Sequence, residues 1–257
     1  MVLAVDIGNT NIVVGCFDEG GMKMLGRLAT DRRATELEYT VQLRNLLKLN
    51  GMAPGQMEGA VLCSVVPMVG ANMKLALEPF VGRNIVVVGP GIRTGLKINI
   101  DNPGALGADR VADAVAAINE YPLPLITVDM GTATTIGVVD ETASFIGGMI
   151  VPGVKVSLNA LSGGTSQLPH ISLEPPKEPI GRNTVDCMRS GIVYHNAAGV
   201  DGMIARIEAQ LGRKCTVVVT GGLAGAITPY CTHEMIYDPD LLLKGLMVIY
   251  RKNRRKS

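Results

Sequence analysis

The chain has 257 residues, of which 47% are hydrophobic, and its formal net charge is +1. This length allows two domains with cores of their own, and the hydrophobic content excludes an intrinsically disordered protein. The near-zero charge gives no electrostatic footprint for nucleic acid or an acidic membrane surface. No apolar run reaches the roughly 18 residues of a membrane-spanning helix.

The cysteines and the start of the chain indicate a cytoplasmic protein. Five cysteines occur without C-x-x-C spacing, and an odd number argues against a disulfide framework. Cys16, Cys63 and Cys215 lie in strand-like runs and read as small core residues. The chain begins directly with an apolar run, so we expect no signal peptide, a cytoplasmic location, and neither nucleic acid nor membrane as a partner.

A β-meander with a polar first turn opens the chain. Residues 1–28 read as three strands, and the first turn carries Asp6, Gly8, Asn9 and Thr10. Gly8 permits a ligand to approach the backbone closely, and free N–H groups beside a hydroxyl can hold phosphate oxygens. These residues also suit an ordinary hairpin, and the turn by itself leaves both interpretations open.

The first half continues with alternating helices and strands. Apolar residues at helical spacing predict a helix from Thr35 to Leu49, and Glu38 completes a capping signal with Thr35. A mixed sheet with helices packed on it accounts for this order. The other expected elements are strands at 59–66 and 85–88, a helix at 67–79 and an extended piece at 96–100.

A further helix is expected to begin at Gly107, which places Asp109 and Arg110 in its first turn. The positive end of the helix dipole favours an ionised carboxylate and a bound anion. Acidic residues also begin helices without any catalytic role, so the position alone does not identify a catalytic residue.

The second half repeats the opening pattern. Asp129, Gly131 and Thr132 follow an apolar run 123 residues after the first copy, with matching strand-like runs around them. Such a repeat predicts two related domains, which we draw as 1–117 and 118–257, each a mixed sheet flanked by helices. The other expected elements are a meander at 122–150, helices at 153–161, 184–211 and 241–250, and a strand at 217–219.

Four motifs occur along the chain in this order: Asp6-x-Gly8-Asn9-Thr10, Gly107-Ala108-Asp109-Arg110, Asp129-x-Gly131-Thr132-Ala133-Thr134-Thr135 and Gly147-Gly148-x-Ile150-x-Pro152-Gly153. In these motifs and their order the chain resembles the type III pantothenate kinases, members of the acetate and sugar kinase, actin and heat-shock ATPase superfamily. The resemblance implies an α/β fold of two tandem ribonuclease-H-like (actin-like ATPase) domains with a nucleotide cleft between them. It also implies ATP-dependent phosphorylation of pantothenate to 4'-phosphopantothenate, the first step of coenzyme A biosynthesis.

The resemblance also implies roles for single residues. It assigns Asp109 as the catalytic residue and Asp129 as the ligand of a monovalent cation, K⁺ or NH4⁺. Some members have a substrate-contacting tyrosine where this chain has Ile100 and Asp101, so that contact differs here. The implied nucleotide is ATP accompanied by a divalent cation, Mg²⁺. The residues implied to bind ATP are Asp6, Ile7, Gly8, Asn9, Thr10, Asn11, Ile12, Val13 and Thr132. Those implied to bind pantothenate are Gly107, Ala108, Asp109, Arg110 and Thr184.

A homodimer is a further implication of the resemblance. The predicted helix at 184–211 carries an apolar stripe that looks broader than one sheet should cover. A helix fully buried in its own domain would explain the stripe equally well. The nine residues of this stripe are Met188, Ile192, Val193, Tyr194, Ala197, Ala198, Val200, Met203 and Ile204.

Two other functions fit the same motifs. A kinase of another small hydroxy acid or sugar would have similar phosphate turns, and only its choice of acceptor would differ. A non-catalytic ATP-binding regulatory protein is the third possibility, and Asp109 argues against it because such a protein needs no carboxylate in an acceptor pocket.

Overall fold

A computed structural model describes residues 1–254 of the chain. The chain forms two compact units, each with a sheet of its own. Unit 1 comprises residues 1–96, 101–116 and the C-terminal segment from Asp240. Unit 2 comprises residues 97–100 and 117–239. The last three residues of the predicted second domain, 255–257, lie outside the described residues.

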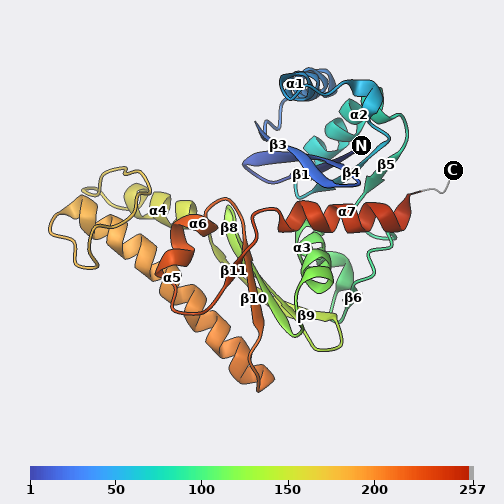
Figure 1. The fold of residues 1–257 in the computed structure, drawn as a ribbon. Helices are drawn as coiled ribbons and strands as arrows, with labels where there is room; N and C mark the ends of the chain where they lie inside the picture. Colours follow the sequence, from blue (N-terminus) through green and yellow to red (C-terminus); the bar gives the residue numbers. More distant parts are fainter. Residues whose placement is uncertain (255–257) are drawn as a thin grey trace. The chain divides into compact units, whose positions relative to one another are not determined.

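The sheet of unit 1 is mixed, as expected (Figure 1). Its strands are β1 Val2–Ile7, β2 Asn11–Asp18, β3 Gly21–Ala29, β4 Gly59–Ser64 and β5 Ile85–Val87. They are ordered β3-β2-β1-β4-β5. The first three form the predicted antiparallel meander, and β4 and β5 run parallel to β1. The helices of this unit are α1 Glu36–Leu49, α2 Pro67–Val81, most of α3 Ala108–Glu120, and α7 Leu241–Asn253.

Local signals explain where the helices of unit 1 begin. The Thr35 hydroxyl accepts a hydrogen bond from the backbone amide of Glu38 at 3.4 Å. The Glu38 carboxylate accepts one from the backbone amide of Thr35 at 2.7 Å. Together these bonds form the predicted capping box. Pro67 occupies the first turn of α2, where a missing N–H costs no hydrogen bond.

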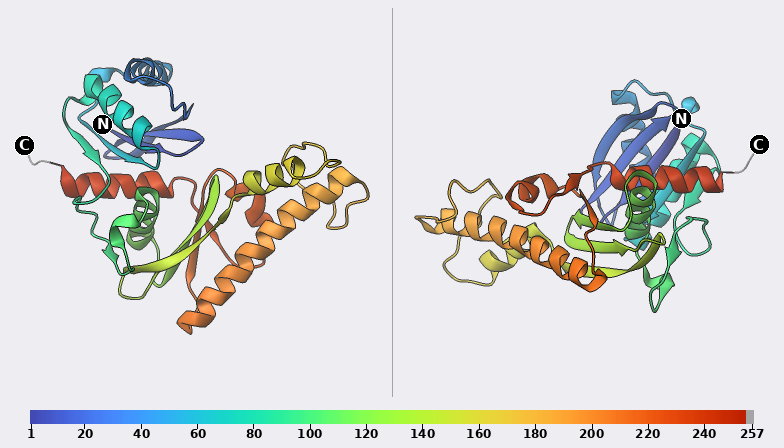
Figure 2. Two further views of the ribbon diagram at one scale, coloured as in Figure 1. Left: turned by 180° about the vertical axis from the view of Figure 1, so that it is seen from behind. Right: turned by 60° about the horizontal axis from the view of Figure 1, so that its bottom comes forward.

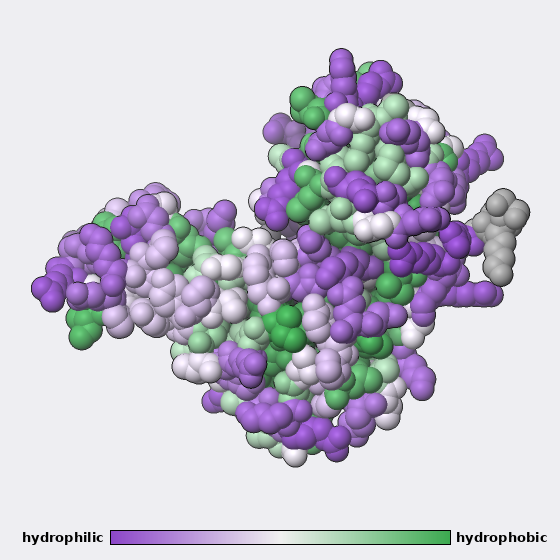
Figure 3. Space-filling model, in the orientation of Figure 1, coloured by the Kyte–Doolittle hydropathy of each residue, from purple (hydrophilic) through white to green (hydrophobic). Residues whose placement is uncertain are grey.

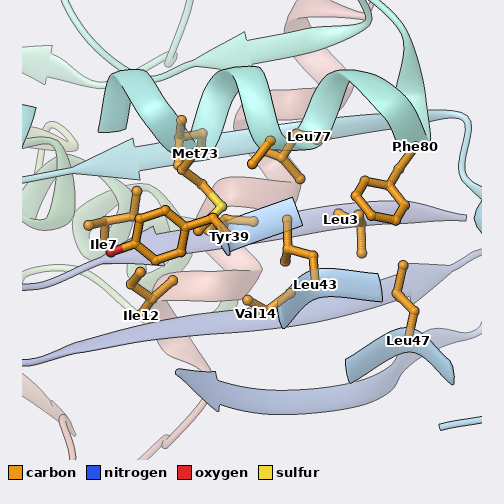
Figure 4. Packing of buried hydrophobic residues seen from close by; sticks show 14 of the residues in the cluster. Leu3, Ile7, Ile12, Val14, Tyr39, Leu43, Leu47, Met73, Leu77 and Phe80 are labelled. Atoms are coloured by element: carbon orange, nitrogen blue, oxygen red, sulfur yellow. The ribbon is translucent and has the colours of Figure 1, made fainter. Parts of the chain in front are cut away.

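The strand alternation of unit 1 separates a hydrophobic face from a face that carries chemistry. Leu3 and Ile7 of β1 join residues of α1 and α2 in one core (Figure 4). Leu62 of β4 belongs to the same core. Because successive side chains point to opposite faces, Asp6 on β1 and Cys63 on β4 lie on the other face. Figure 4 labels the packed residues Leu3, Ile7, Ile12, Val14, Tyr39, Leu43, Leu47, Met73, Leu77 and Phe80.

The other face of this sheet receives α7. This helix contacts β1 and β4, and Gly15 makes room for Leu243 of α7. A Cβ at Gly245 would collide with the carbonyl of Ala112, so this glycine allows α7 and α3 to approach closely. The sequence analysis placed one domain boundary between residues 117 and 118. The compact units divide the chain differently, because α7, at the C-terminal end, packs on the sheet of unit 1.

Unit 2 contains a sheet ordered β11-β10-β7-β8-β9-β6. Its strands are β6 Lys97–Ile98, β7 Leu125–Met130, β8 Ala133–Val139, β9 Ser144–Pro152, β10 Thr216–Thr220 and β11 Ile236–Tyr237. Its helices are α4 Val154–Gly163, α5 Thr184–Leu211 and the short α6 Ala224–Ile227. Short 3₁₀ turns occur in the chain at Pro54–Gln56, Pro103–Ala105 and Thr228–Tyr230.

The two sheets repeat one topology, which confirms the predicted tandem fold. The order β3-β2-β1-β4-β5 of unit 1 recurs in unit 2 as β9-β8-β7-β10-β11, and β6 extends the second sheet by pairing with β9. In both copies three antiparallel strands are followed by strands parallel to the first. The sequence did not predict β11 or α6, each of which has at most four residues.

Helix α5 spans the predicted residues (Figure 2). Asn183 caps the start of the helix, because its Oδ1 accepts a hydrogen bond from the backbone amide of Asp186 at 2.9 Å. Gly212 ends the helix in the left-handed conformation. Most of the predicted apolar stripe belongs to the core of unit 2: Met188, Ile192, Val193, Ala197, Val200 and Ile204 are buried. The breadth of the stripe is therefore largely explained by this unit's own core.

Within residues 1–254, no helix is both long enough and apolar enough to cross a membrane. On the face drawn in Figure 3, hydrophilic residues predominate and hydrophobic residues form small separate patches.

Candidate functional site

The turn between β1 and β2 is tightly closed and carries an exposed polar tip. Ile7 and Ile12 form the last strand pair, and the amide of Gly8 donates to the carbonyl of Asn11 at 3.0 Å. Asn9 and Thr10 are exposed at the tip. The eight residues from Asp6 to Val13 thus form one compact hairpin end, on which the backbone and two polar side chains face solvent.

Thr30 braces this turn from the end of β3. Its hydroxyl donates to the carbonyl of Gly8 at 2.8 Å, and its amide donates to the carbonyl of Thr10 at 3.1 Å. The Arg32 guanidinium also reaches the tip and donates to Oδ1 of Asn9 at 3.3 Å. Sequence reasoning missed Thr30 and Arg32, and only their position just after the third strand of the meander could have indicated them.

Asp6 is half-buried at the end of β1, on the face of the sheet opposite the α1–α2 core. Burial raises its pKa from 3.8 to about 6, because the charged form loses hydration. A hydrogen bond from Cys63 lowers the pKa, and the nearby Asp109 carboxylate raises it further. The turn therefore contains a carboxylate whose ionisation is costly unless a positive charge approaches it.

Cys63 lies directly opposite Asp6 in the parallel pairing of β1 and β4. It is buried, as the sequence predicted, but its thiol also donates to Oδ1 of Asp6 at 3.0 Å. The interpretation as a small core residue is thus incomplete. The pairing register that creates this contact depends on two strands more than fifty residues apart.

The Gly107–Arg110 motif begins α3, as predicted, and Asp109 lies in its first turn. The amide of Arg110 donates to Oδ1 of Asp109 at 2.8 Å, which fixes the carboxylate at the helix start. A Cβ at Gly107 would collide with that same oxygen, so a side chain at this position would force the Asp109 carboxylate to move. The electrostatic influence of Asp109 on Asp6 brings this motif and the first turn together within unit 1.

Arg110 is partly buried near two carboxylates. Burial lowers the pKa of its guanidinium, whereas Asp109 and Asp113 raise it. Asp113 is 2% exposed and lies one helical turn after Asp109. Sequence reasoning did not single out Asp113, although the four-residue spacing would have placed it on the same helical face.

Unit 2 holds the second turn, between β7 and β8. The amide of Gly131 donates to the carbonyl of Ala133 at 3.0 Å, so this turn closes one residue earlier than the first. Thr132 is exposed at the tip, and its carbonyl accepts the amide of Gly153 at 3.1 Å. A Cβ at Gly153 would collide with the backbone of the turn, which explains the glycine of the fourth motif.

Asp129 occupies the same place in β7 that Asp6 occupies in β1, one residue before the strand ends. It is half-buried and pairs in register with Thr220 on β10. Gly221 follows with a φ of 97°, and a Cβ there would collide with Oδ1 of Asp129 and the backbone of Met130. The carboxylate is therefore packed closely against backbone at the strand ends.

Thr184 begins α5 and lies on an open groove of unit 2 with a volume of about 420 Å³. The surface of this groove is almost entirely apolar, although two polar residues, Thr184 and His195, take part in its lining. The residues that line it are Leu161, Leu168, Thr184, Cys187, Met188, Gly191, Ile192 and His195. Within the described part of the chain, its lining includes neither Asp129 nor Thr132. Thr184 thus belongs to a different feature of unit 2 from the second turn.

Ile100 and Asp101 follow β6, which pairs with the start of β9. Ile100 is half-buried and Asp101 is exposed.

Comparisons with known proteins agree on one family. Residues 2–206 match the family model described as type III pantothenate kinase. The chain is 41% identical over 253 residues to the type III pantothenate kinase of Moorella thermoacetica, which covers 98% of this chain and 100% of the relative. It is 43% identical over 254 residues to that of Exiguobacterium sibiricum, with 99% and 100% covered.

Solved structures agree on the fold. Component A of (R)-2-hydroxyglutaryl-CoA dehydratase from Acidaminococcus fermentans superposes with a TM-score of 0.57 at 15% identity, covering 98% of both chains. The ethanolamine utilization protein EutJ from Carboxydothermus hydrogenoformans gives 0.56 at 18% identity, covering 98% of this chain and 89% of its own. At such identities the likeness concerns the fold alone.

Proposed function

The chain belongs to the type III pantothenate kinase family, and from this premise we propose how its residues phosphorylate pantothenate in coenzyme A biosynthesis. The protein is an ATP-dependent kinase whose acceptor is the primary hydroxyl of pantothenate. Such a transfer needs its reactants positioned and the phosphate charge neutralised, with little covalent chemistry by the protein. The roles below are assigned on that basis.

Asp109 is the proposed catalytic residue. The observation that supports it best is the fixed carboxylate at the start of α3, held by the Arg110 amide and packed on Gly107 within electrostatic reach of Asp6. A carboxylate within hydrogen-bond distance of the acceptor hydroxyl can orient it and take its proton as the phosphoryl group arrives.

The residues from Asp6 to Val13 and Thr132 are assigned to ATP. In both turns, backbone amides and exposed hydroxyl or amide side chains surround a glycine, as phosphate oxygens require. Gly107, Ala108 and Arg110 are assigned to pantothenate beside Asp109. The Arg110 guanidinium is suited to the carboxylate of pantothenate or to the transferred phosphate, because its donors form a planar fork.

Thr184 is also assigned to pantothenate, through the resemblance alone. Its position on the groove is compatible with an exposed hydroxyl that meets a ligand, since the residue itself is exposed.

The divalent cation that accompanies ATP suits the residues of unit 1. Residues 1–254 contain no group of three or more His, Cys, Asp or Glu side chains arranged for a metal ion. Mg²⁺ is usually held by one or two carboxylates together with phosphates and water, so a prebuilt cage is not required. Asp6, whose burial makes ionisation costly, is a carboxylate that a nearby cation would stabilise in its charged form. When bound, Mg²⁺ neutralises phosphate charge.

A monovalent cation, K⁺ or NH4⁺, is proposed at Asp129. The support is the half-buried carboxylate packed against the backbone of Met130 and Gly221. Carbonyl oxygens and a carboxylate together are a suitable donor set for a weakly hydrated cation.

A homodimer in the cytoplasm completes the proposal. The groove beside α5 is apolar and open, and Cys187, Gly191 and His195 on its wall are exposed. An exposed apolar surface of this kind favours contact with another protein surface, and a two-fold pairing of identical chains is the commonest arrangement.

A panel of acceptors tests the function. Purified protein with ATP should phosphorylate pantothenate and leave sugars and other small hydroxy acids unreacted. Turnover of another alcohol with pantothenate inert would instead favour the second kinase hypothesis. No product in a single-turnover experiment would favour the non-catalytic protein.

Replacement of Asp109 by Asn tests the mechanism. We expect turnover to fall by about 10² or more, the usual contribution of a positioned acid–base group, while ATP binding and folding persist. The matched control Glu120→Gln changes a carboxylate in the last turn of the same helix and should keep full activity. Unchanged turnover in Asp109→Asn would remove this residue from the mechanism.

A further inference from the structure

The contact between Cys63 and Asp6 joins a buried thiol to the carboxylate of a half-buried residue. Sγ of Cys63 lies 3.0 Å from Oδ1 of Asp6, and the two residues are paired in the register of β4 and β1. Cys63 has no exposed surface, whereas Asp6 keeps part of its own. One carboxylate oxygen of Asp6 thus accepts a hydrogen bond from a buried thiol, and the residue Asp6 remains partly accessible to solvent.

The groups around the thiol are acidic. Asp6, Asp109 and Asp113 all raise the pKa of Cys63, and burial raises it more than any of them, well above the usual value of 9.0. The hydrogen bond from Sγ of Cys63 to Oδ1 of Asp6 therefore lies in acidic surroundings. The Arg110 guanidinium is the charged group of opposite sign that interacts with Asp109 and Asp113 here.

We propose that Cys63 is a positioning residue for phosphoryl transfer, whose thiol holds the Asp6 carboxylate in the orientation that meets MgATP. The inference rests on the proposed role of Asp6 in binding ATP. A thiol is a weak, neutral donor, so it satisfies Oδ1 and leaves the negative charge of Asp6 available. A lysine or arginine would neutralise that charge, and an apolar residue would leave a buried acceptor without its donor.

The internal repeat supports the inference independently. Thr220 pairs with Asp129 in unit 2 as Cys63 pairs with Asp6 in unit 1, both through the parallel strand that follows the meander in the sheet. Thr220 is 3% exposed. Both strand-end aspartates therefore have a buried neighbour that carries a hydrogen-bond donor, a thiol in one copy and a hydroxyl in the other.

Substitutions at Cys63 separate positioning from packing. Cys63→Ala should reduce kcat/KM for MgATP about tenfold, equivalent to 1.4 kcal/mol, and raise the Kd for MgATP measured by calorimetry by a similar factor. The KM for pantothenate should not change. Cys63→Ser restores a donor and should recover both values to within about threefold. Cys63→Val fills the site without a donor and should show the same losses as Cys63→Ala. It also provides the test if the alanine variant does not fold.

Cys16→Ala is the matched control. Cys16 is also a fully buried cysteine of the same sheet, and its thiol contacts Met57 rather than a carboxylate. This variant should lower stability without altering kcat/KM or the Kd for MgATP. Equal kinetic losses in Cys16→Ala and Cys63→Ala would reduce Cys63 to a packing residue and overturn the inference.

A double-mutant cycle with Asp6→Asn distinguishes this inference from the proposed function. If Cys63 acts through Asp6, the losses in MgATP affinity are not additive, because without the negative charge at residue 6 the orientation that the thiol sets no longer affects MgATP binding. Additive losses, or a normal Kd in both Cys63→Ala and Cys63→Val beside a damaged Asp6→Asn, overturn the role of Cys63 alone. A normal Kd in Asp6→Asn overturns the proposed role of Asp6 itself.

Discussion

Asp6→Asn should make the protein more stable at neutral pH while it damages nucleotide binding. In the folded protein, burial raises the pKa of Asp6 from 3.8 to about 6. The folded state thus holds this proton more tightly than the unfolded chain does. The stability contributed by protonation is present at low pH and is lost as the pH rises through about 6. An asparagine removes the charge and keeps a side-chain oxygen that can accept a hydrogen bond from the Cys63 thiol.

The size of the gain follows from the difference between the two pKa values. Each unit of pKa corresponds to about 1.4 kcal/mol, so ionising Asp6 in the folded protein costs roughly 3 kcal/mol at pH 7.5. Asp6→Asn should therefore raise the free energy of unfolding by up to about 3 kcal/mol at that pH. At pH 4 the wild-type carboxyl is protonated in the folded state, and the difference should fall below about 1 kcal/mol.

Urea unfolding followed by circular dichroism at pH 7.5 and pH 4 measures both values, without nucleotide or divalent cation. Glu19→Gln, at an exposed carboxylate in the turn between β2 and β3, is the control and should change stability little. An Asp6→Asn gain that is absent at pH 7.5, or equally large at pH 4, would refute the argument that burial of this carboxylate is costly.

Two further predictions concern the monovalent cation and the dimer. Replacing K⁺ by Na⁺ should lower activity in the wild type, and Asp129→Ala should abolish the difference between the two salts; equal wild-type rates in both salts would contradict the assignment. Gly191→Arg places a long charged side chain on the exposed wall of the apolar groove. This variant should be monomeric by light scattering and bind pantothenate more weakly, with ATP binding much less affected. A wild-type protein that is monomeric and fully active at micromolar concentration would exclude the dimer.

Local patterns were sufficient for most elements and for the family. The Thr35–Glu38 capping box, the Asn183 cap and Gly212 mark helix ends through contacts within a few residues, so they can be recognised along the chain. The two polar turns repeat with flanking strands, and that repeat predicts two related domains, whose sheets share one topology in the structure. The four motifs that carry the family resemblance likewise lie in short continuous segments.

Contacts between distant segments required the tertiary structure. Helix α7 packs on β1 and β4, and β6 pairs with β9, although both pairs are far apart in sequence. Apolar periodicity shows that a helix buries one face, but it does not say which sheet covers that face. Some residues of the candidate site could likewise be recognised from local sequence, and others could not. The short motifs indicated Asp6 and Asp109 as candidates. The thiol of Cys63 was found beside Asp6 only through the parallel register of two strands, because such a register is set by the packing of the whole unit.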